Sequence, residues 1–324
     1  MKLLLIKTEG MAPLALREEH IKKIQAVDTS IEIVAVGASS QNEIERQLVD
    51  AEIIAGSPRV LPSSFKNARE LKWIHSFSAG MERVLTPEVV SSQILVSNSS
   101  GIHAIPIAEH VLGFMLIFTR KFYDTFCKQQ QKIWEKNQDI TELRDKVVLI
   151  VGLGRIGLQA AKLVSCVGAK VIAVDQADKE KPKFVAELYS ADQFGEALPK
   201  ADFVVLCLPY TQETHHFFGM EKFRMMKNTA VLINIGRGGV VHEKELIEAL
   251  QNKIIGGAAL DVTEEEPLPP ESPLWEMENV VITPHHSGWS EKYMDRAIDL
   301  FCIHLKAYLT GQPLPNLVDK EKGY

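Results

Sequence analysis

The 324-residue chain has little of several features that would mark other classes of protein. It has four cysteines, with no CxxC pair and no spacing typical of metal ligands, which argues against a disulfide framework or a metal site. Its 36 Lys and Arg residues are outnumbered by 42 Asp and Glu residues, so it lacks the basic excess of nucleic-acid-binding proteins. No apolar run approaches the ~18–20 residues of a membrane span, and the run at 3–6 is shorter than the ~7–15 residues of a signal-peptide core. We therefore expect a soluble, cytoplasmic protein with no metal, no nucleic-acid partner and no membrane partner.

What the chain does have is a repeated alternation of short apolar runs with amphipathic segments. Its length and its 46% hydrophobic residues favour two domains with full cores. The runs that predict strands fall at 2–7, 31–37, 51–56, 73–78 and 94–98, and then at 147–152, 170–175, 202–209, 230–236, 257–262 and 280–285. Strands that alternate with helices predict parallel sheets. The six later runs are apolar throughout, as in a sheet covered on both faces, and they match the size of a dinucleotide-binding sheet. Helical patterns cover 105–131 and the segment after Gly288.

A glycine-rich turn follows the first of the six later strands and opens a helix. The stretch GLGRIG has the spacing G-x-G-x-x-G, and Asp175 follows 18 residues after its last glycine, at the end of the next strand. In that context the spacing strongly favours dinucleotide binding, because the glycines let the backbone approach a pyrophosphate at a helix N-terminus. We predict a cofactor site that includes Gly152, Gly154, Arg155, Ile156 and Gly157. Asp175 would bind the ribose hydroxyls and repel a 2′-phosphate, so NAD is the predicted cofactor. The nearby Lys179 and Lys181 keep NADP open as an alternative.

Four polar or turn-forming residues come at the ends of the later strands, namely Pro209, Arg237, Asp261 and His285. The carboxyl ends of parallel strands meet at one edge of a sheet, where ligands bind. The guanidinium of Arg237 offers a planar fork of donors that suits a carboxylate. On this evidence alone Arg237 could equally cap a helix, and His285 or the adjacent His286 could be an ordinary loop residue.

The sequence contains seven motifs in this order: SAGMER, AEH, GLGRIG, LPYTQET, NIGRGGVV, ALDVTEEEP and TPHHSG. Through these motifs it resembles the D-isomer-specific 2-hydroxyacid dehydrogenases. The resemblance implies three catalytic residues: Arg237 to bind the substrate, His285 as the acid/base, and Glu266 as the partner of that histidine. It implies that backbone amides around Ser78, Ala79 and Gly80 hold the substrate carboxylate. It also implies that the dinucleotide site is lined by Pro209, Thr214, Ile235, Gly236 and Asp261. The chain departs from the usual pattern at Glu82, His242, Thr263 and Trp289.

The strand pattern and the resemblance together predict an α/β protein with two doubly wound parallel-sheet domains. A Rossmann NAD-binding domain of residues 101–287 would be inserted into a flavodoxin-like substrate domain of residues 1–100 and 288–324. The implied activity is hydride transfer between NAD(H) and a small 2-oxo or D-2-hydroxy acid of the glyoxylate/hydroxypyruvate type. Phosphoglycerate dehydrogenase activity and an NAD-sensing, corepressor-like binding protein stay open as alternatives. The resemblance further implies a homodimer built mainly through the NAD domain, to which a buried helix near 105–127 contributes.

Overall fold

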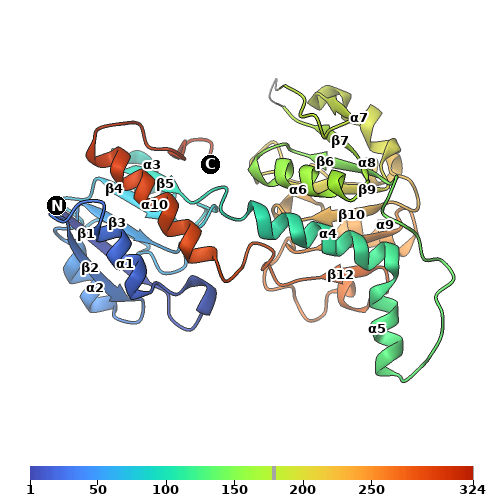
Figure 1. The fold of residues 1–324 in the computed structure, drawn as a ribbon, viewed down its shortest axis with the longest axis horizontal. Coiled ribbons are helices and arrows are strands. Elements are labelled where there is room, and N and C mark those ends of the chain that lie inside the picture. The colour runs from blue at the N-terminus through green and yellow to red at the C-terminus, as the bar shows by residue number, and fades with distance from the viewer. Residues whose placement is uncertain (177–179, 324) are drawn as a thin grey trace. The chain divides into compact units, whose positions relative to one another are not determined.

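The computed structural model describes residues 1–176 and 180–323. The chain divides into two compact units, which Figure 1 shows with their elements labelled. The first unit is Met1–Ile102 together with the chain from Trp289 onward, and the second unit is His103–Gly288. The ends of the sequence therefore belong to one unit, and the middle of the sequence forms the other.

The first unit is built on a five-stranded parallel sheet in the order β2-β1-β3-β4-β5. This is the flavodoxin-like order, and all five strands lie where the sequence predicts them. The strands are β1 (Lys2–Lys7), β2 (Glu32–Gly37), β3 (Ile53–Gly56), β4 (Trp73–Ser76) and β5 (Leu95–Asn98). The helices of this unit are α1 (Glu18–Gln25), α2 (Gln41–Leu48), α3 (Pro87–Ser91) and α10 (Tyr293–Leu309).

Alternate residues of these strands face opposite layers of helices. In β1, Leu3 and Leu5 pack in one apolar cluster with Ile24 of α1 and Phe301 of α10. Leu4 belongs to the other cluster, which includes residues of α2 and α3. Because both faces are covered, the strands are apolar along their whole length, as a parallel sheet requires.

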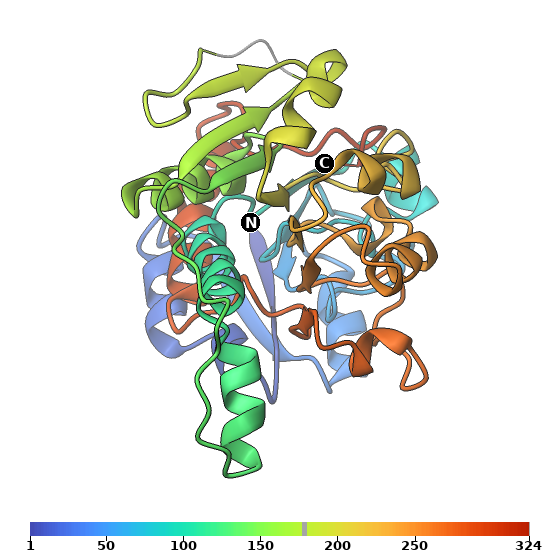
Figure 2. The ribbon, with the colours of Figure 1, turned by 90° about the vertical axis from the view of Figure 1, so that its right-hand side faces the viewer.

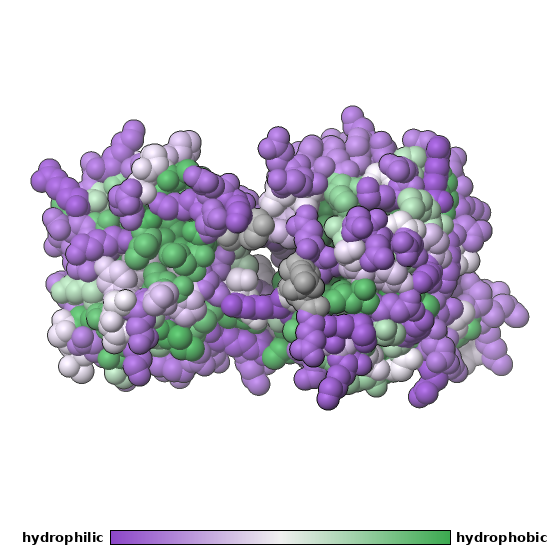
Figure 3. Space-filling model, turned by 90° about the horizontal axis from the view of Figure 1, so that it is seen from above, coloured by the Kyte–Doolittle hydropathy of each residue, from purple (hydrophilic) through white to green (hydrophobic). Residues whose placement is uncertain are grey.

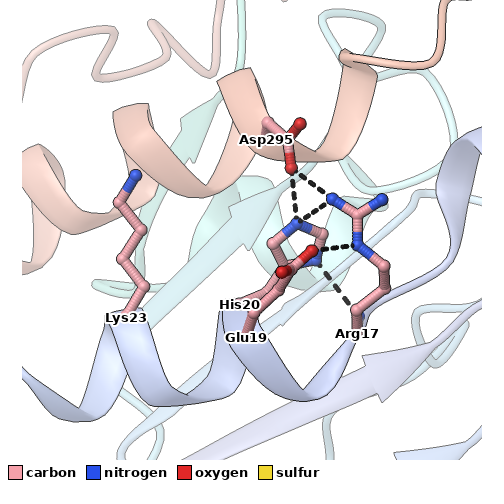
Figure 4. A pocket seen from close by; sticks show the side chains of 5 residues that line it. All are labelled: Arg17, Glu19, His20, Lys23 and Asp295. Carbon is pink, nitrogen blue, oxygen red and sulfur yellow. Dashed lines mark hydrogen bonds and ion pairs between the residues drawn. The ribbon is translucent and has the colours of Figure 1, made fainter.

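A polar cluster links the first helix of the chain to the last one (Figure 4). His20 of α1 is buried, and its Nε2 lies 2.8 Å from Oδ1 of Asp295 on α10. Its Nδ1 accepts from the backbone N–H of Arg17 at 3.1 Å, and the Arg17 guanidinium pairs with Glu19. The hydrogen bond from His20 holds the pKa of the Asp295 carboxyl below its usual range. These contacts fix the register of α10 on α1.

The second unit is built on a seven-stranded parallel sheet in the order β12-β11-β10-β9-β6-β7-β8. The strands are β6 (Val147–Val151), β7 (Lys170–Val174), β8 (Glu187–Tyr189), β9 (Phe203–Leu206), β10 (Val231–Asn234), β11 (Gly257–Leu260) and β12 (Val280–Ile282). The helices are α4 (Ala104–Arg120), α5 (Phe122–Gln130), α6 (Arg155–Cys166), α7 (Phe194–Ala197), α8 (Met220–Met225) and α9 (Glu243–Gln251). Six strands confirm the prediction. The edge strand β8 is an addition, because its three residues ELY carry no continuous apolar run.

Two apolar clusters lie on the two faces of this sheet. Val148 and Ile150 of β6 pack with Val111 of α4 and Val164 of α6. Leu149, between them in sequence, packs in the opposite cluster with residues of α7, α8 and α9. The arrangement is the doubly wound Rossmann fold, with strand order 3-2-1-4-5-6 continued by one further strand.

The helical segment predicted at 105–131 is two helices, and only the first is buried. Lys121 adopts φ 55°, in the left-handed region, and separates α4 from α5. Every residue of α5 is at least partly exposed in the chain. The expectation of a buried helix near 105–127 is therefore wrong for residues 122–127. Figure 2 shows α5 extending away from the sheet of the second unit. Trp134, just beyond α5, is 100% exposed.

Hydrophilic residues cover most of the surface seen from above, with smaller hydrophobic areas among them (Figure 3). Among the described residues, no helix combines the length and the apolar character needed to cross a membrane.

Candidate active site

The glycine turn after β6 has the shape that a pyrophosphate needs. Gly152 adopts φ +92°, and a Cβ on Gly157 would lie 1.9 Å from the carbonyl oxygen of Gly152, so each position requires glycine. A Cβ on Gly154 would meet no atom within 4 Å, so the space in front of this residue is open. Gly154 is also the N-cap of the 12-residue helix α6, whose first two residues are Arg155 and Ile156. The first N–H groups of this helix are directed to the open space in front of Gly154. These residues fit a dinucleotide.

Asp175 follows β7 directly and lies beside this turn. Its Oδ2 accepts a hydrogen bond from the backbone N–H of Leu153 at 2.6 Å, so the carboxylate is held at the glycine turn. Lys181 donates from Nζ to the carbonyl oxygen of Val185 at 2.7 Å. Lys179, the other lysine considered for a 2′-phosphate, lies outside the described residues. The described part of this strand end therefore presents a carboxylate to the turn.

Two further strand ends lie along the same edge of the sheet. After β9, Thr214 donates from Oγ1 to the carbonyl oxygen of Pro209 at 2.7 Å and closes the loop between them. After β10, Ile235 is buried, and a Cβ on Gly236 would lie 2.7 Å from the carbonyl oxygen of Leu208. The glycine thus allows the ends of β9 and β10 to approach closely. The four residues predicted for the cofactor site in these two loops, Pro209, Thr214, Ile235 and Gly236, therefore lie along one edge.

His285 and Glu266 form a hydrogen-bonded pair. Nδ1 of the histidine lies 2.7 Å from Oε2 of the glutamate, and the two side chains are 43% and 36% exposed. Because the carboxylate accepts at Nδ1, the Nε2 atom of the ring is the one available to exchange a proton with a ligand. The pair has the chemistry of an oriented acid/base.

The turn that carries His285 is organised by Asp261, which the sequence assigned to the dinucleotide site. The Asp261 side chain is 2% exposed, and its carboxylate accepts from the Thr283 hydroxyl at 2.6 Å and from the N–H of His286 at 3.0 Å. It also accepts from the N–H and the hydroxyl of Ser287. The Asp261 carbonyl oxygen accepts from the His285 N–H at 2.8 Å. These bonds stabilise His285 at φ +51°, in the left-handed region of backbone conformation that residues other than glycine rarely adopt.

Sequence reasoning did not identify Thr283 or Ser287, although both lie within the motif TPHHSG. It also missed His110 of the motif AEH, whose Nε2 lies 3.0 Å from Oγ1 of Thr283. Burial lowers the pKa of His110, which favours its neutral form. The Thr283 hydroxyl donates its one hydrogen to Asp261, so Nε2 of His110 is assigned as the donor to Thr283. This chain of hydrogen bonds extends from α4 to the His285 turn. His286 contributes its backbone N–H, and its ring meets the ring of His110 edge to face at 5.6 Å.

Arg237 lies in a tightly packed loop next to the segment that carries Glu266. Its guanidinium donates to the carbonyl oxygen of Gly236 at 2.9 Å, and its own carbonyl accepts from Asn234. A Cβ on the next residue, Gly238, would lie 1.8 Å from the carbonyl oxygen of Thr263. Only glycine permits this approach, and Thr263 in turn donates its N–H to Glu266 at 3.4 Å. The structure therefore brings Arg237, Glu266 and His285 to one region of the second unit.

Glu264, in the run of three glutamates that ends at Glu266, is held by several hydrogen bonds. Its carboxylate lies 2.7 Å from Nε2 of His216, and it exchanges backbone-to-carboxylate hydrogen bonds with Glu243. Burial alone would raise the pKa of Glu264, but the hydrogen bond with His216 holds it below its usual range. Glu265, between Glu264 and Glu266, is exposed.

Ser78, Ala79 and Gly80 lie in the first unit, in the loop after β4. The N–H of Ser78 donates to Oγ of Ser76 at 3.1 Å, so it is already used within the loop. Among the described residues, neither the Ala79 N–H nor the Gly80 N–H has an acceptor. Any carboxylate bound by this loop would therefore meet Ala79 and Gly80.

Within the part of the chain that the structure describes, two groups of side chains have the spacing of metal ligands, with ligand atoms within 4.8 Å of one another: His110, Asp261 and His286, and Glu19, His20 and Asp295. The hydrogen bonds described above account for the position of Asp261 in the first group and of His20 in the second. Neither group needs an ion to explain its geometry.

Three features occur together at one sheet edge: a glycine turn at a helix N-terminus, an acidic residue after the next strand, and an acid/base pair. This combination defines a dinucleotide-dependent oxidoreductase. Residues 112–287 match the family model described as "D-isomer specific 2-hydroxyacid dehydrogenase, NAD binding domain". A glyoxylate reductase of Thermofilum pendens is 34% identical over 278 residues, which cover 84% of this chain and 79% of that protein. The chain belongs to the D-isomer-specific 2-hydroxyacid dehydrogenase family, and it is a nicotinamide-dependent oxidoreductase.

Solved structures agree with this assignment over the whole chain. A D-isomer specific 2-hydroxyacid dehydrogenase family protein of Aeromonas salmonicida superposes with a TM-score of 0.87 at 30% identity, covering 98% of this chain and 99% of that one. An NADPH-dependent glyoxylate/hydroxypyruvate reductase of Sinorhizobium meliloti, solved with NADP and sulfate, gives a TM-score of 0.82 at 27% identity and covers 100% of both chains.

Proposed function

We propose that the protein reduces a small 2-oxo acid of the glyoxylate/hydroxypyruvate type to the D-2-hydroxy acid, with NADH as the preferred cofactor. The observation that carries the proposal is the 2.7 Å pair of His285 and Glu266 beside the Arg237 loop. The names of the relatives from Thermofilum pendens and Sinorhizobium meliloti support this substrate class.

Each of the three side chains has a distinct task in this reaction. A bound nicotinamide would supply the hydride for C2 of the substrate, and the residues of the chain would do the rest. Protonated His285 donates from Nε2 to the carbonyl oxygen as charge develops there, and neutral His285 takes that proton back in the oxidative direction. Glu266 fixes the ring through Nδ1 and stabilises the imidazolium. Arg237 neutralises the substrate carboxylate and polarises the carbonyl, and the N–H groups of Ala79 and Gly80 are further donors for the carboxylate.

The preference for NADH rests on Asp175. A carboxylate held at the glycine turn offers acceptors to the ribose hydroxyls and repels a 2′-phosphate. NADP in the Sinorhizobium meliloti structure makes NADPH the alternative that an assay must test.

We also propose a homodimer that assembles through the second unit. Its support is the run of exposed apolar side chains on α5 and just beyond it: Phe122, Tyr123, Phe126, Ile133 and Trp134. Apolar side chains gathered on one projecting segment typically mark an interface, and aromatic residues supply much of the binding free energy in such contacts.

We propose a cytoplasmic location as well. The four cysteines are free thiols, which supports a reducing compartment.

The test is steady-state oxidation of NADH and of NADPH with glyoxylate, hydroxypyruvate, pyruvate, phenylpyruvate and 3-phosphohydroxypyruvate. The proposal expects the highest kcat/KM with glyoxylate or hydroxypyruvate and NADH. A clear preference for 3-phosphohydroxypyruvate would replace this substrate class with that of phosphoglycerate dehydrogenase. Tight NADH binding with no turnover of any acid would favour an NAD-sensing binding protein.

A further inference from the structure

The carbonyl groups of the loop after β4 are anchored by donors at the ends of β4 and β5 and by the residue that follows β5. The Ser78 carbonyl accepts from the Ser99 N–H and from the Ser76 hydroxyl, each at 3.1 Å. The Ala79 carbonyl accepts from Nδ2 of Asn98 at 3.1 Å. The parallel register pairs Ser76 with Asn98, so β5 delivers these donors directly beside the loop.

This anchoring determines where the neighbouring N–H groups point. A trans peptide group is planar, and its C=O and N–H point in opposite directions. Fixing the Ala79 carbonyl toward Asn98 therefore directs the N–H of Gly80 away from Asn98. Fixing the Ser78 carbonyl toward Ser99 directs the N–H of Ala79 away in the same manner. Two successive N–H groups aimed away from their anchors are a concavity that suits an anion.

The Asn98 side chain is itself held in one orientation. It is 6% exposed, and its Oδ1 accepts from the Ser100 N–H at 3.0 Å, which assigns Nδ2 to the Ala79 carbonyl. A buried amide with both ends bonded has little freedom to rotate. It can therefore transmit a fixed orientation to the peptide group between Ala79 and Gly80.

We propose that Asn98 is a positioning residue for the substrate carboxylate. It acts through the Ala79 carbonyl by holding the Gly80 N–H in the direction that binds the carboxylate of the 2-oxo acid. This inference rests on the proposed function, because it assigns to this loop the carboxylate of that substrate.

The experiment compares Asn98→Ala and Asn98→Asp with the matched variant Asn316→Ala. Both Asn98 variants lose the Nδ2 donor, and Asn98→Asp keeps the size of the side chain and the acceptor for Ser100. Asn316 also donates from Nδ2 to this segment, but to the carbonyl oxygens of Asn98 and Ser100, and these two bonds account for both hydrogens of its amide. The readouts are kcat, the KM values for glyoxylate and NADH, and the inhibition constant of oxamate, which carries the same carboxylate.

We expect the Asn98 variants to raise the KM for glyoxylate and the inhibition constant of oxamate together, by roughly three- to tenfold, as the loss of one hydrogen bond implies. The kcat and the KM for NADH should stay within about twofold of the wild type, and Asn316→Ala should leave both glyoxylate and oxamate values unchanged. If the wild type is active and its Asn98 variants keep the wild-type KM for glyoxylate, this inference is overturned and the proposed function stands. An equal rise in Asn316→Ala would reduce Asn98 to a structural role. A wild type that reduces no 2-oxo acid would contradict the proposed function, and this inference with it.

Discussion

Replacing Glu266 by glutamine should slow the reduction of 2-oxo acids. Glutamine keeps an oxygen that can accept from Nδ1 of His285, so the ring should stay oriented, but the negative charge at 2.7 Å is lost. The two side chains are 43% and 36% exposed, so solvent screens the pair, and such ion pairs stabilise by roughly 0.2–1 kcal/mol. Because about 1.36 kcal/mol corresponds to a tenfold change in rate, the loss of this stabilisation should lower kcat/KM by at most roughly fivefold.

The sign follows from the mechanism. Donation of a proton from Nε2 requires the charged form of the His285 ring, and the Glu266 carboxylate stabilises that form. The assay is kcat/KM for glyoxylate at saturating NADH. Glu265→Gln is the matched control, because Glu265 is the exposed neighbour in the same run, whereas Glu264 is bonded to His216. A kcat/KM that is unchanged or higher in Glu266→Gln, or that falls equally in Glu265→Gln, would refute the assignment of the pair.

Two further variants test the cofactor and the assembly. Asp175→Ala should lower kcat/KM for NADH at least tenfold, since charge-assisted hydrogen bonds are worth roughly 1.5–3 kcal/mol, and should improve the use of NADPH. A wild type that prefers NADPH would contradict this interpretation of the strand end. Trp134→Ser combined with Phe126→Ser should convert the dimer into a monomer in light scattering at micromolar concentration, because it removes two exposed aromatic side chains from the proposed interface. A monomeric wild type would rule out the proposed dimer.

The strands could be predicted from the sequence because parallel sheets covered on both faces need continuous apolar runs. Such runs gave all five strands of the first unit and six strands of the second. The glycine turn was equally accessible, because only glycine tolerates the φ of Gly152 and the contact between Gly157 and Gly152. Topology then predicted which loops share an edge, since the carboxyl ends of parallel strands converge.

Other features depend on tertiary contacts that no local pattern encodes. The strand β8 is held by pairing with β7 rather than by its own composition. The role of Asp261 in the His285 turn, and the link from His110 through Thr283, join segments more than 20 residues apart. No proline or glycine occurs between residues 114 and 131, so the local sequence does not mark the break at Lys121 and predicts one continuous helix there.

The most direct test of the account is single-turnover hydride transfer from NADH to glyoxylate in His285→Asn and in His286→Asn. The account predicts that His285→Asn lowers the rate by ~10²–10⁴, the range for a positioned acid/base, while the affinity for NADH stays near that of the wild type. His286→Asn should change the rate far less, because His286 contributes its backbone N–H to Asp261. A severe loss in His286→Asn with a mild loss in His285→Asn would contradict the account.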